Sequence, residues 1–299
     1  MFTLSAFADE ISPDPQQQID VLTSCGIKHI EFRSILNTNV LALSDLQIQE
    51  FKSLLDKHGF KLSAIGSPIG KIRVDEPFAP HQEKFQRAIE LCRVFGTPNI
   101  RIFSYYPAET GEFVGQVANL PVERQVGNLP HESRHDWQQW RGEVISRLSQ
   151  HCELAEKAKV RLVHENEHRI YGDDPARVVD IMQTLRQRFG PAVIGAVYDP
   201  ANYVFCGFDP WQGWEMTKQY TIHFHIKDWR AGEKHGSIPG EGEGQIPRVL
   251  ADAVRMKFDG FATMEPHLLG GGPTGGQTGP ELFPKAVAAF KKLLAEASR

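Results

Sequence analysis

The 299-residue sequence contains only four cysteines, and no two of them have the CxxC spacing of a zinc or thiol-redox motif. Cys25, Cys92 and Cys152 fall within or at the ends of stretches with helical periodicity. A buried free thiol is the expected state of a cysteine in such a place. This usage excludes a small disulfide-stapled secreted domain and is typical of a protein in the reducing cytoplasm.

Long apolar runs and a strong excess of one charge are also missing. No apolar run approaches the roughly 20 residues that span a bilayer. Residues 1–14 lack a basic region and reach Asp9 and Glu10 early, so we expect no signal peptide. The formal net charge of −4 excludes the basic surface of a general nucleic-acid or membrane-surface binder. We therefore predict a cytoplasmic protein with a small-molecule partner; whether it forms a homo-oligomer is left open.

What the sequence does contain is an alternation of short apolar runs with longer amphipathic stretches. The apolar runs are rich in β-branched and aromatic residues, as buried parallel strands are. We predict strands at 3–8, 28–33, 61–66, 98–103, 160–165, 193–198, 221–227 and 260–265. We predict helices at 14–25, 44–59, 80–95, 137–159, 174–189, 210–219, 246–257 and 281–298.

Eight such units predict an α/β fold, a single (β/α)8 TIM barrel over residues 1–299. A large doubly wound sheet is the alternative, but the Rossmann glycine fingerprint is missing after the first strand. Local signals support the helix boundaries. Asp14 precedes a proline suited to the first helical position, Ser44 suits an N-cap, and Gly59 suits the end of a helix.

Residues 108–136 interrupt this rhythm after the fourth predicted strand. The segment is polar and carries a short internal repeat, QVANLP at 116–121 and QVGNLP at 125–130. Two copies are too few for a solenoid. We interpret it as a surface insertion without chemistry. The alternative is a lid, because the segment leaves the carboxyl end of a strand, where barrel active sites lie.

The last four predicted strands each deliver an acidic or imidazole side chain at their carboxyl end. These residues are Glu165, Asp199, His225 and Glu265. In a parallel barrel such strand ends meet at one face. Four of these groups in one barrel mouth would desolvate and repel one another, and a divalent cation relieves that cost. Three carboxylates and one imidazole suit Mn²⁺, our preferred ion, or Mg²⁺, Co²⁺ or Zn²⁺.

Each of the four residues also has a structural alternative. Glu165 would pair with an arginine, Asp199 would cap the segment after it, and His225 would be a hydrogen-bonded core histidine. The alternative for Glu265 is a purely structural role. Glu265 precedes Pro266, which holds it in an extended conformation, and a buried glutamate there is costly unless it has a partner.

Seven short motifs occur in a characteristic order along the chain. They are HIEFRS (29–34), SAIGSPIGK (63–71), LVHENEH (162–168), YDPAN (198–202), HFHIKD (223–228), PGEGEG (239–244) and MEP (264–266). Together they resemble the sugar phosphate isomerase/epimerase family, with its xylose-isomerase-like TIM barrel. The resemblance covers most of the chain outside 108–136. It implies one divalent metal ion with Glu165, Asp199, His225 and Glu265 as ligands.

The resemblance further implies a metal-dependent isomerase or epimerase of a sugar or sugar derivative. In the family's epimerases the two glutamates flank the substrate carbon, which gives Glu165 and Glu265 the role of acid/base groups around an enediolate. Asn202 stands where a well-studied epimerase branch has histidine. Two alternatives therefore stay open: a metal-dependent dehydratase of a keto-sugar or inosose, and a non-catalytic sugar-binding barrel.

Polar residues near the other strand ends are candidates for contacting the substrate. They are Arg33, Ser67, Lys71, Arg101, Asn202, Lys227, Arg230 and His267. The glycine-rich stretch 270–280 follows the last strand, where barrels often bind phosphate through backbone N–H groups. An ordinary glycine-rich loop is the alternative, so phosphorylated and unphosphorylated sugars are both open.

Overall fold

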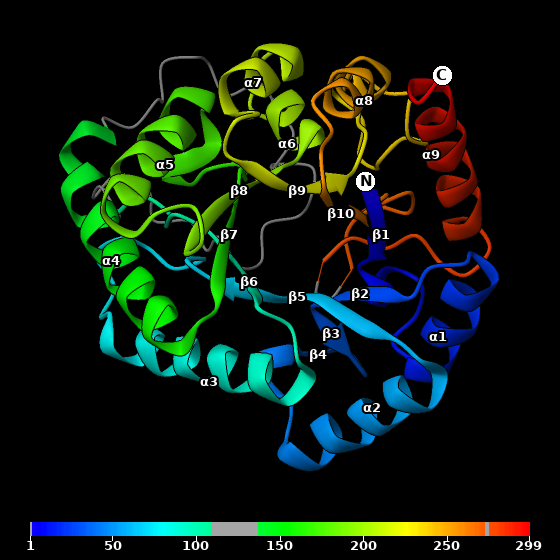
Figure 1. Ribbon diagram of the computed structural model, residues 1–299, viewed down its shortest axis with the longest axis horizontal. Coiled ribbons are helices and arrows are strands. Elements are labelled where there is room, and N and C mark those ends of the chain that lie inside the picture. The colour runs from blue at the N-terminus through cyan, green and yellow to red at the C-terminus, as the bar shows by residue number, and fades with distance from the viewer. Residues whose placement is uncertain (1, 109–136, 273–274) are drawn as a thin grey trace.

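The computed structural model describes residues 2–108, 137–272 and 275–299, and it confirms the predicted TIM barrel (Figure 1). Eight parallel strands form one sheet in the order β1-β10-β9-β8-β7-β6-β5-β2. The strands are β1 (Phe2–Ala6), β2 (His29–Phe32), β5 (Lys61–Ile69), β6 (Asn99–Ile102), β7 (Arg161–Glu165), β8 (Ile194–Tyr198), β9 (Thr221–Ile226) and β10 (Gly260–Met264). Strands β1 and β2 lie side by side, so the sheet curls into a nearly closed barrel.

The helices form a ring outside the sheet (Figure 1). They are α1 (Pro15–Ser24), α2 (Asp45–His58), α3 (Ala79–Phe95), α4 (Trp137–Ala158), α5 (Pro175–Phe189), α6 (Pro200–Phe205), α7 (Pro210–Thr217), α8 (Ile246–Arg255) and α9 (Phe283–Ala297). The predicted helix signals are present. Asp14 accepts a hydrogen bond from the Gln16 amide, Ser44 forms a capping box with Gln47, and Gly59 takes the left-handed conformation with φ 68°.

Several short elements of the described chain were not predicted, among them two strands and one helix. Strands β3 (Ser34–Ile35) and β4 (Thr38–Asn39) form a small antiparallel hairpin, and α6 (Pro200–Phe205) precedes the predicted helix α7. Each is too short for a repeating apolar pattern to appear. Most of the predicted insertion, residues 109–136, lies outside the described residues, so neither interpretation of it is tested.

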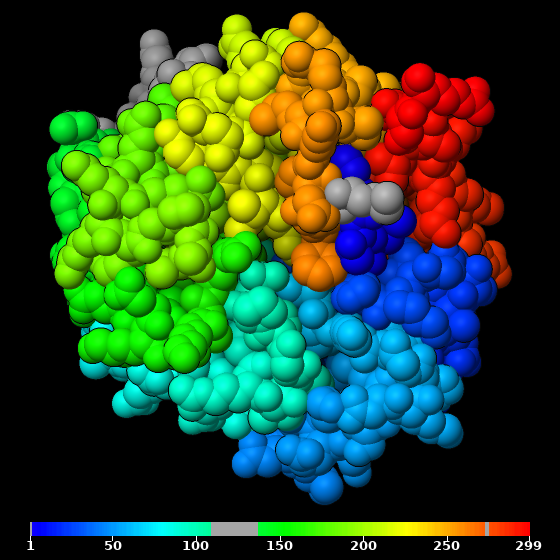
Figure 2. Space-filling view, in the orientation of Figure 1, coloured from blue at the N-terminus to red at the C-terminus, as the bar shows by residue number. Residues whose placement is uncertain are grey.

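The apolar core lies between the sheet and the surrounding helices. Helix α5 shows the pattern, because its buried residues Val178, Ile181, Met182 and Leu185 follow the three-and-four spacing of one helix face. Figure 2 shows side chains closing the middle of the barrel on the face it displays, as in other TIM barrels. None of the described helices has the length and apolar character that crossing a bilayer demands. Cys25, Cys92 and Cys152 are buried free thiols, as predicted.

A histidine is buried without polar partners between α3 and α4. His151 is fully buried, and within the described ranges neither of its ring nitrogens forms a hydrogen bond. Its ring packs on Phe85 at 4.4 Å and on Phe78 at 5.1 Å between centroids. Burial, with smaller contributions from His81 and Arg147, lowers the pKa of His151 to about 3. The folded protein therefore holds this ring neutral.

We expect His151→Phe to make the protein less sensitive to acid. An unfolded histidine takes up a proton near pH 6.5, whereas the lowered pKa keeps folded His151 neutral to about pH 3. The unfolded state thus binds more protons in this window, and stability falls as the pH drops. Between pH 7 and pH 5 the free energy of unfolding of the wild type should therefore fall by about 2 kcal/mol more than that of His151→Phe.

Urea unfolding at pH 7 and pH 5 measures this difference. The exposed His235 supplies the control, because His235→Gln should leave the pH dependence as it is in the wild type. Equal losses of stability in the wild type and His151→Phe between the two pH values would contradict the prediction.

Candidate metal centre

The structure brings together the four side chains predicted to ligate a metal. Glu165 ends β7, Asp199 and Glu265 directly follow β8 and β10, and His225 lies on β9. One ligand atom of each lies within 4.8 Å of those of the others. The Nδ1 atom of His225 is 3.1 Å from Oε1 of Glu165 and 3.2 Å from Oε2 of Glu265. All four side chains are buried at the barrel mouth.

Asp199 has two oxygens with two different surroundings. It is the N-cap of α6, and its Oδ1 accepts a hydrogen bond from the Asn202 amide at 3.1 Å. Its Oδ2 belongs to the interior and lies 2.7 Å from Nζ of Lys227. The capping interpretation and the ligand interpretation of Asp199 are therefore compatible, because each uses a different oxygen.

The donor atoms of this cluster suit a divalent cation. Oδ2 of Asp199, Nδ1 of His225 and Oε2 of Glu265 are buried, and among the residues the structure describes their nearest polar partners are the charged groups Lys227 and Glu165 and one another. All three can offer a lone pair, and a set of carboxylates with one imidazole suits Mn²⁺, Mg²⁺, Co²⁺ or Zn²⁺. The residues present thus fit a metal, without specifying which one.

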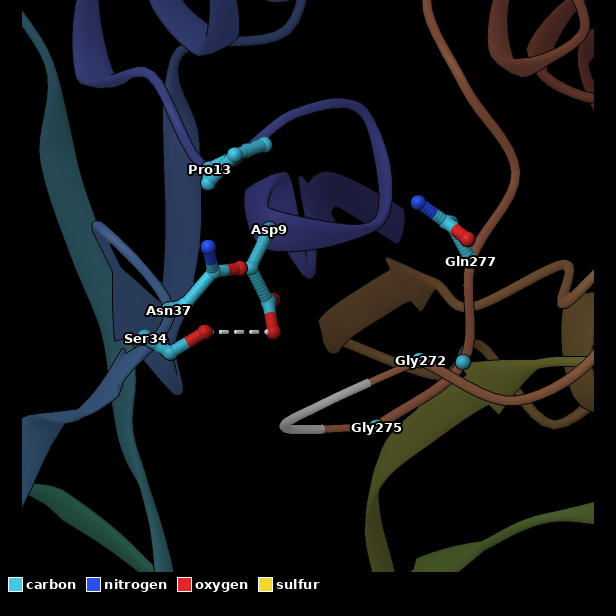
Figure 3. Close-up of a pocket in the computed structure, with 8 residues that line it drawn as sticks. Asp9, Pro13, Ser34, Asn37, Gly272, Gly275 and Gln277 are labelled. Atoms are coloured by element: carbon cyan, nitrogen blue, oxygen red, sulfur yellow. Dashed lines mark hydrogen bonds between the residues drawn. The ribbon is translucent and has the colours of Figure 1, made fainter.

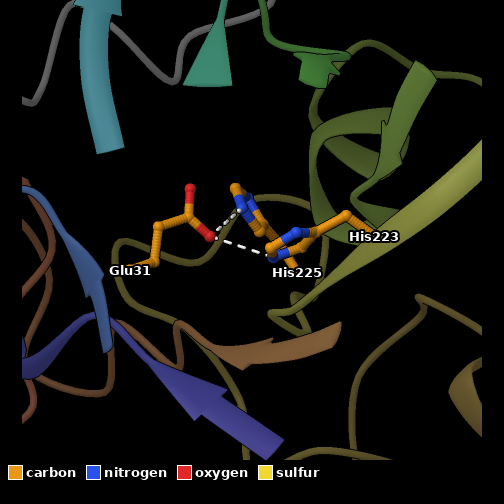
Figure 4. Close-up of side chains that lie close together, drawn as sticks. All are labelled: Glu31, His223 and His225. Carbon is orange, nitrogen blue, oxygen red and sulfur yellow. Dashed lines mark hydrogen bonds and ion pairs between the residues drawn. The ribbon is translucent and has the colours of Figure 1, made fainter. Parts of the chain in front are cut away.

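Glu31 of β2 orients the candidate histidine ligand (Figure 4). Its Oε2 lies 3.2 Å from Nε2 of His225, and it also contacts His223 and Thr263 at 3.0 Å each. An ionised carboxylate only accepts hydrogen bonds, so it favours the tautomer of His225 with the proton on Nε2. Nδ1, which faces Glu165 and Glu265, is then the nitrogen left for a metal. Although burial opposes its charge, Glu165 and Glu31 raise the pKa of His225 well above the usual range, so a metal would displace the Nδ1 proton. Sequence reasoning gave Glu31 no role.

We expect Glu31→Gln to weaken Mn²⁺ binding by about 10- to 100-fold, the usual effect of losing a carboxylate behind a ligating histidine. The substitution keeps the size of the side chain but removes the charge that holds the Nε2 proton. Isothermal titration with Mn²⁺ measures the affinity, and ¹⁵N NMR of the Mg²⁺-loaded protein reports the tautomer of His225. The exposed Glu241→Gln is the control. Wild-type affinity in Glu31→Gln would show that Glu31 only packs in the barrel.

Opposite charges around the two glutamates keep them ionised. Burial opposes the charge of Glu165, yet His225 and Arg101 lower its pKa. Burial likewise opposes the charge of Glu265, but Lys227, His225 and His267 hold its pKa well below the usual range. Both carboxylates are therefore ionised at neutral pH, which is the form that a general base needs.

Asp199 differs from these two glutamates. Burial raises the pKa of Asp199 to about 7, although Lys227 opposes this rise. Glu165 and Glu265 add to the increase because they place like charges nearby. A bound cation would relieve this repulsion.

Two predicted substrate-contacting arginines pair with the cluster. Arg33 donates from Nη1 to Oε1 of Glu265 at 3.0 Å, and Arg101 donates from Nη1 to Oε2 of Glu165 at 3.1 Å. Each leaves the second carboxylate oxygen, on the side of His225, for other partners. Pairing with arginine, the structural alternative for Glu165, thus coexists with the convergence of the four groups.

The other candidates differ in how near they come. Nδ2 of Asn202 lies 3.3 Å from Oε1 of Glu165, and Lys227 contacts Asp199. His267 lies 3.3 Å from Oε1 of Glu265. Lys71 stands farther out and pairs with Glu167 at 3.0 Å.

Ser67 and Arg230 have structural partners. Ser67 is buried and donates to the backbone oxygen of Arg101. Arg230 is half-exposed, and its Nε donates to the backbone oxygen of Glu241. The structure therefore gives Arg230 no contact with the cluster among the described residues, and its predicted role in substrate binding lacks support.

The PGEGEG motif is organised by Asp228, which follows β9. Its buried carboxylate accepts hydrogen bonds from the amides of Gly240, Gly242 and Gly244 at 2.8–2.9 Å. A Cβ atom at Gly242 would lie 2.3 Å from Oδ1 of Asp228, which explains the glycine. A Cβ at Gly244 would lie 3.1 Å from Cβ of Pro200. The loop therefore packs against the residue that follows Asp199.

These features define the class of protein: a (β/α)8 barrel with acidic and imidazole groups converging at the carboxyl ends of its strands. The chain belongs to the xylose isomerase-like TIM barrel family, which its residues 19–293 match. A search of curated proteins finds no match.

Solved structures with the same fold share little sequence with this chain. A xylose isomerase-like TIM barrel protein from Mycobacterium smegmatis, in complex with magnesium, is 17% identical with a TM-score of 0.69, over 100% of this chain and 97% of its own. D-psicose 3-epimerase from Clostridium cellulolyticum H10, with D-tagatose, is 14% identical with a TM-score of 0.67, over 100% of both chains. The probable 3-DHS dehydratase AsbF from Bacillus anthracis is 15% identical with a TM-score of 0.68, over 97% of this chain and 98% of its own.

Proposed function

We propose that this protein is a divalent-metal-dependent sugar isomerase or epimerase that works through an enediolate. The observation that carries the proposal is the convergence of Glu165, Asp199, His225 and Glu265, with buried oxygen and nitrogen atoms that can ligate a cation, at the barrel mouth. The family and the sugar epimerase among the solved structures of this fold support it. A divalent cation held by these four residues would polarise a substrate carbonyl and stabilise the developing oxyanion.

Glu165 and Glu265 are the proposed acid/base groups. They come from β7 and from the end of β10, which are separated in the sheet by β8 and β9. Their carboxylates therefore approach His225 from two directions, at 3.1 and 3.2 Å. One carboxylate removes the proton next to the carbonyl. Return of a proton by the other carboxylate, on the opposite face, inverts that carbon, and delivery to the neighbouring carbon isomerises the sugar.

A dehydratase is the second candidate, and the position of Lys227 favours it. Its buried ammonium lies 2.7 Å from Oδ2 of Asp199 and 3.8 Å from Oε2 of Glu265. The pKa of Lys227 is raised: although burial opposes its charge, Asp199 and Glu265 outweigh that effect. A charged ammonium beside the acid/base groups can hydrogen-bond to a departing hydroxyl group while a glutamate returns to it the proton taken from the substrate, so that the group leaves as water.

Solvent exchange in D₂O tests the proposed function. The protein is loaded with Mn²⁺ or Mg²⁺ and incubated with ketoses and inososes, and deuterium next to the carbonyl is followed by NMR or mass spectrometry. Exchange with retention of all hydroxyl groups supports an isomerase or epimerase, whereas exchange followed by loss of water supports the dehydratase. A metal-loaded protein that exchanges no compound would contradict both.

A further inference from the structure

An aromatic ring lies among the charged groups of the candidate metal centre. Phe7 directly follows β1, its amide donates to the backbone oxygen of Met264 at 3.1 Å, and its side chain is fully buried. The ring meets His225 edge-on, with 5.1 Å between the ring centroids and an interplanar angle of 78°. The guanidinium carbons of Arg33 and Arg101 lie over the same ring, at 4.4 and 4.8 Å from its centroid. One phenyl ring therefore contacts two cations and the candidate histidine ligand.

The edges of the Arg33 guanidinium group are bound to carboxylates. Its Nη1 donates to Oε1 of Glu265 at 3.0 Å, and its Nε donates to Oδ2 of Asp9 at 2.8 Å. Asp9 is held in turn by Ser34, whose hydroxyl donates to the same oxygen at 2.8 Å (Figure 3). All the donors of a guanidinium group lie in its plane, so these contacts leave its flat face to the ring of Phe7.

Arg101 makes the corresponding contacts with the second proposed acid/base group. Its Nη1 donates to Oε2 of Glu165 at 3.1 Å, and its Nη2 donates to the backbone oxygen of Gly66 at 3.2 Å. Gly66 also makes room for the ring, because a Cβ atom there would lie 3.0 Å from the side chain of Phe7. The second guanidinium group is thus bound at its edge and covered on its face in the same way as the first.

An aromatic side chain is the apolar residue that suits the position of Phe7. A buried guanidinium face against an aliphatic side chain would lose the solvation of its charge without compensation. The face of a phenyl ring carries partial negative charge, so it attracts a cation that lies over it, and this attraction is strongest where water is excluded. The two charges over the ring therefore account for an aromatic residue here, beyond the filling of space.

The arginines determine which carboxylate oxygens face the centre. Arg33 binds Oε1 of Glu265, and the other oxygen, Oε2, lies 3.2 Å from Nδ1 of His225. Arg101 binds Oε2 of Glu165, and Oε1 lies 3.1 Å from the same nitrogen. A shift of either guanidinium group would turn the carboxylate bound to it, and one phenyl ring contacts both groups.

We propose that Phe7 is a positioning residue: its ring holds Arg33 and Arg101 in place, and through them it sets the orientation of the carboxylates of Glu165 and Glu265. The inference rests on the proposed function, because it concerns how the two acid/base groups are held for proton transfer. A displacement of about 1 Å is enough to slow an enzymatic reaction by on the order of 100-fold. The role therefore predicts a loss of rate that exceeds any loss of substrate binding.

Fluorinated phenylalanines at position 7 test this role, because fluorine withdraws electron density from the ring face and leaves the size of the ring nearly unchanged. 4-Fluorophenylalanine and 3,4,5-trifluorophenylalanine are incorporated there. Deuterium exchange is measured at saturating Mn²⁺ with the compound that the wild type exchanges fastest. We expect kcat to fall stepwise, by on the order of 10-fold for the trifluoro ring, with KM nearly unchanged.

Phe290 supplies the matched control. Its side chain is fully buried on α9, and its ring lies over no cation among the residues that the structure describes. The same fluorinated residues at position 290 should leave kcat and KM at the wild-type values. An equal kcat throughout the series at position 7, or an equal fall at position 290, would overturn the inference and leave the proposed function standing.

A second measurement decides the inference if the wild type exchanges no compound, the outcome that counts against the proposed function. In the metal-free protein, ¹⁵N NMR follows the exchange of the Nε protons of Arg33 and Arg101 with water, and Arg33→Lys and Arg101→Lys assign the two signals. With the trifluoro ring at position 7 we expect both protons to exchange on the order of 10-fold faster than in the wild type, because each guanidinium group leaves the ring more often. The trifluoro ring at position 290 should leave both rates as they are in the wild type. An unchanged rate for either proton with the trifluoro ring at position 7 would overturn the inference.

Discussion

Glu265→Gln is expected to lower the rate of solvent proton exchange into the substrate by about 10²- to 10⁴-fold, the contribution of a positioned acid/base group. Glutamine has nearly the same shape and can still accept the hydrogen bond that Arg33 donates to Oε1. It cannot take up a proton at neutral pH. The variant therefore separates proton transfer from the packing of the barrel mouth.

The measurement is deuterium incorporation at saturating Mn²⁺, with the bound metal of each sample determined in parallel. Glu233→Gln is the control, because Glu233 contacts the half-exposed Arg230 outside the candidate centre. If Glu265→Gln exchanges at the wild-type rate with full metal content, Glu265 is not an acid/base group. If ligand binding persists and neither protein shows exchange, the barrel binds sugars without turnover.

Much of the barrel was predictable because its signals are local and repeated. Each strand is a short apolar run, and each helix shows one apolar face or a capping residue such as Ser44. The convergence of Glu165 and Glu265, 100 residues apart in the sequence, follows from a topological rule: parallel strands end at one face. No contact between them had to be known in advance.

What was missed depends on contacts across the barrel. Glu31 and His225 are separated by 194 residues and meet through side chains that cross the interior, which no local pattern reveals. Arg230 was proposed because it closely follows β9, but the chain has left the strand by then and its side chain is half-exposed. Nearness in sequence to a strand end is therefore not sufficient, because Asn202 and His267 also follow their strands by several residues and yet contact the cluster.

Close contacts also bear on the glycine-rich stretch 270–280, which the sequence left open as a phosphate site or an ordinary loop. Glycines after the last strand of a barrel often mark a phosphate site. Here Gly275 lies where a Cβ would strike Arg33, so glycine is required by a close approach to a side chain. Composition alone does not distinguish these two reasons for a glycine.

Asp199→Ala is expected to abolish tight metal binding. Its affinity for Mn²⁺ should fall by more than about 100-fold, the upper effect of losing a residue that only hydrogen-bonds to a ligand. The substitution removes Oδ2 from the cluster and leaves Lys227 without its nearest partner. A buried ammonium in that position repels a cation. The metal that remains after dialysis, together with titration calorimetry, measures the loss.

Loss of the α6 cap could by itself lower stability in Asp199→Ala, so a second variant is needed. The side chain introduced by Asp199→Asn can still accept the hydrogen bond from the Asn202 amide, because asparagine is a good N-cap, but it brings no negative charge. Asp209→Ala is the complementary control: it removes the cap of α7, where Asp209 accepts from the Trp211 amide. We expect weak metal binding in Asp199→Asn at nearly wild-type stability, and wild-type metal binding in Asp209→Ala. Full metal content in Asp199→Asn would show that metal binding does not need the charge of Asp199. The residue would then have only its role as a helix cap.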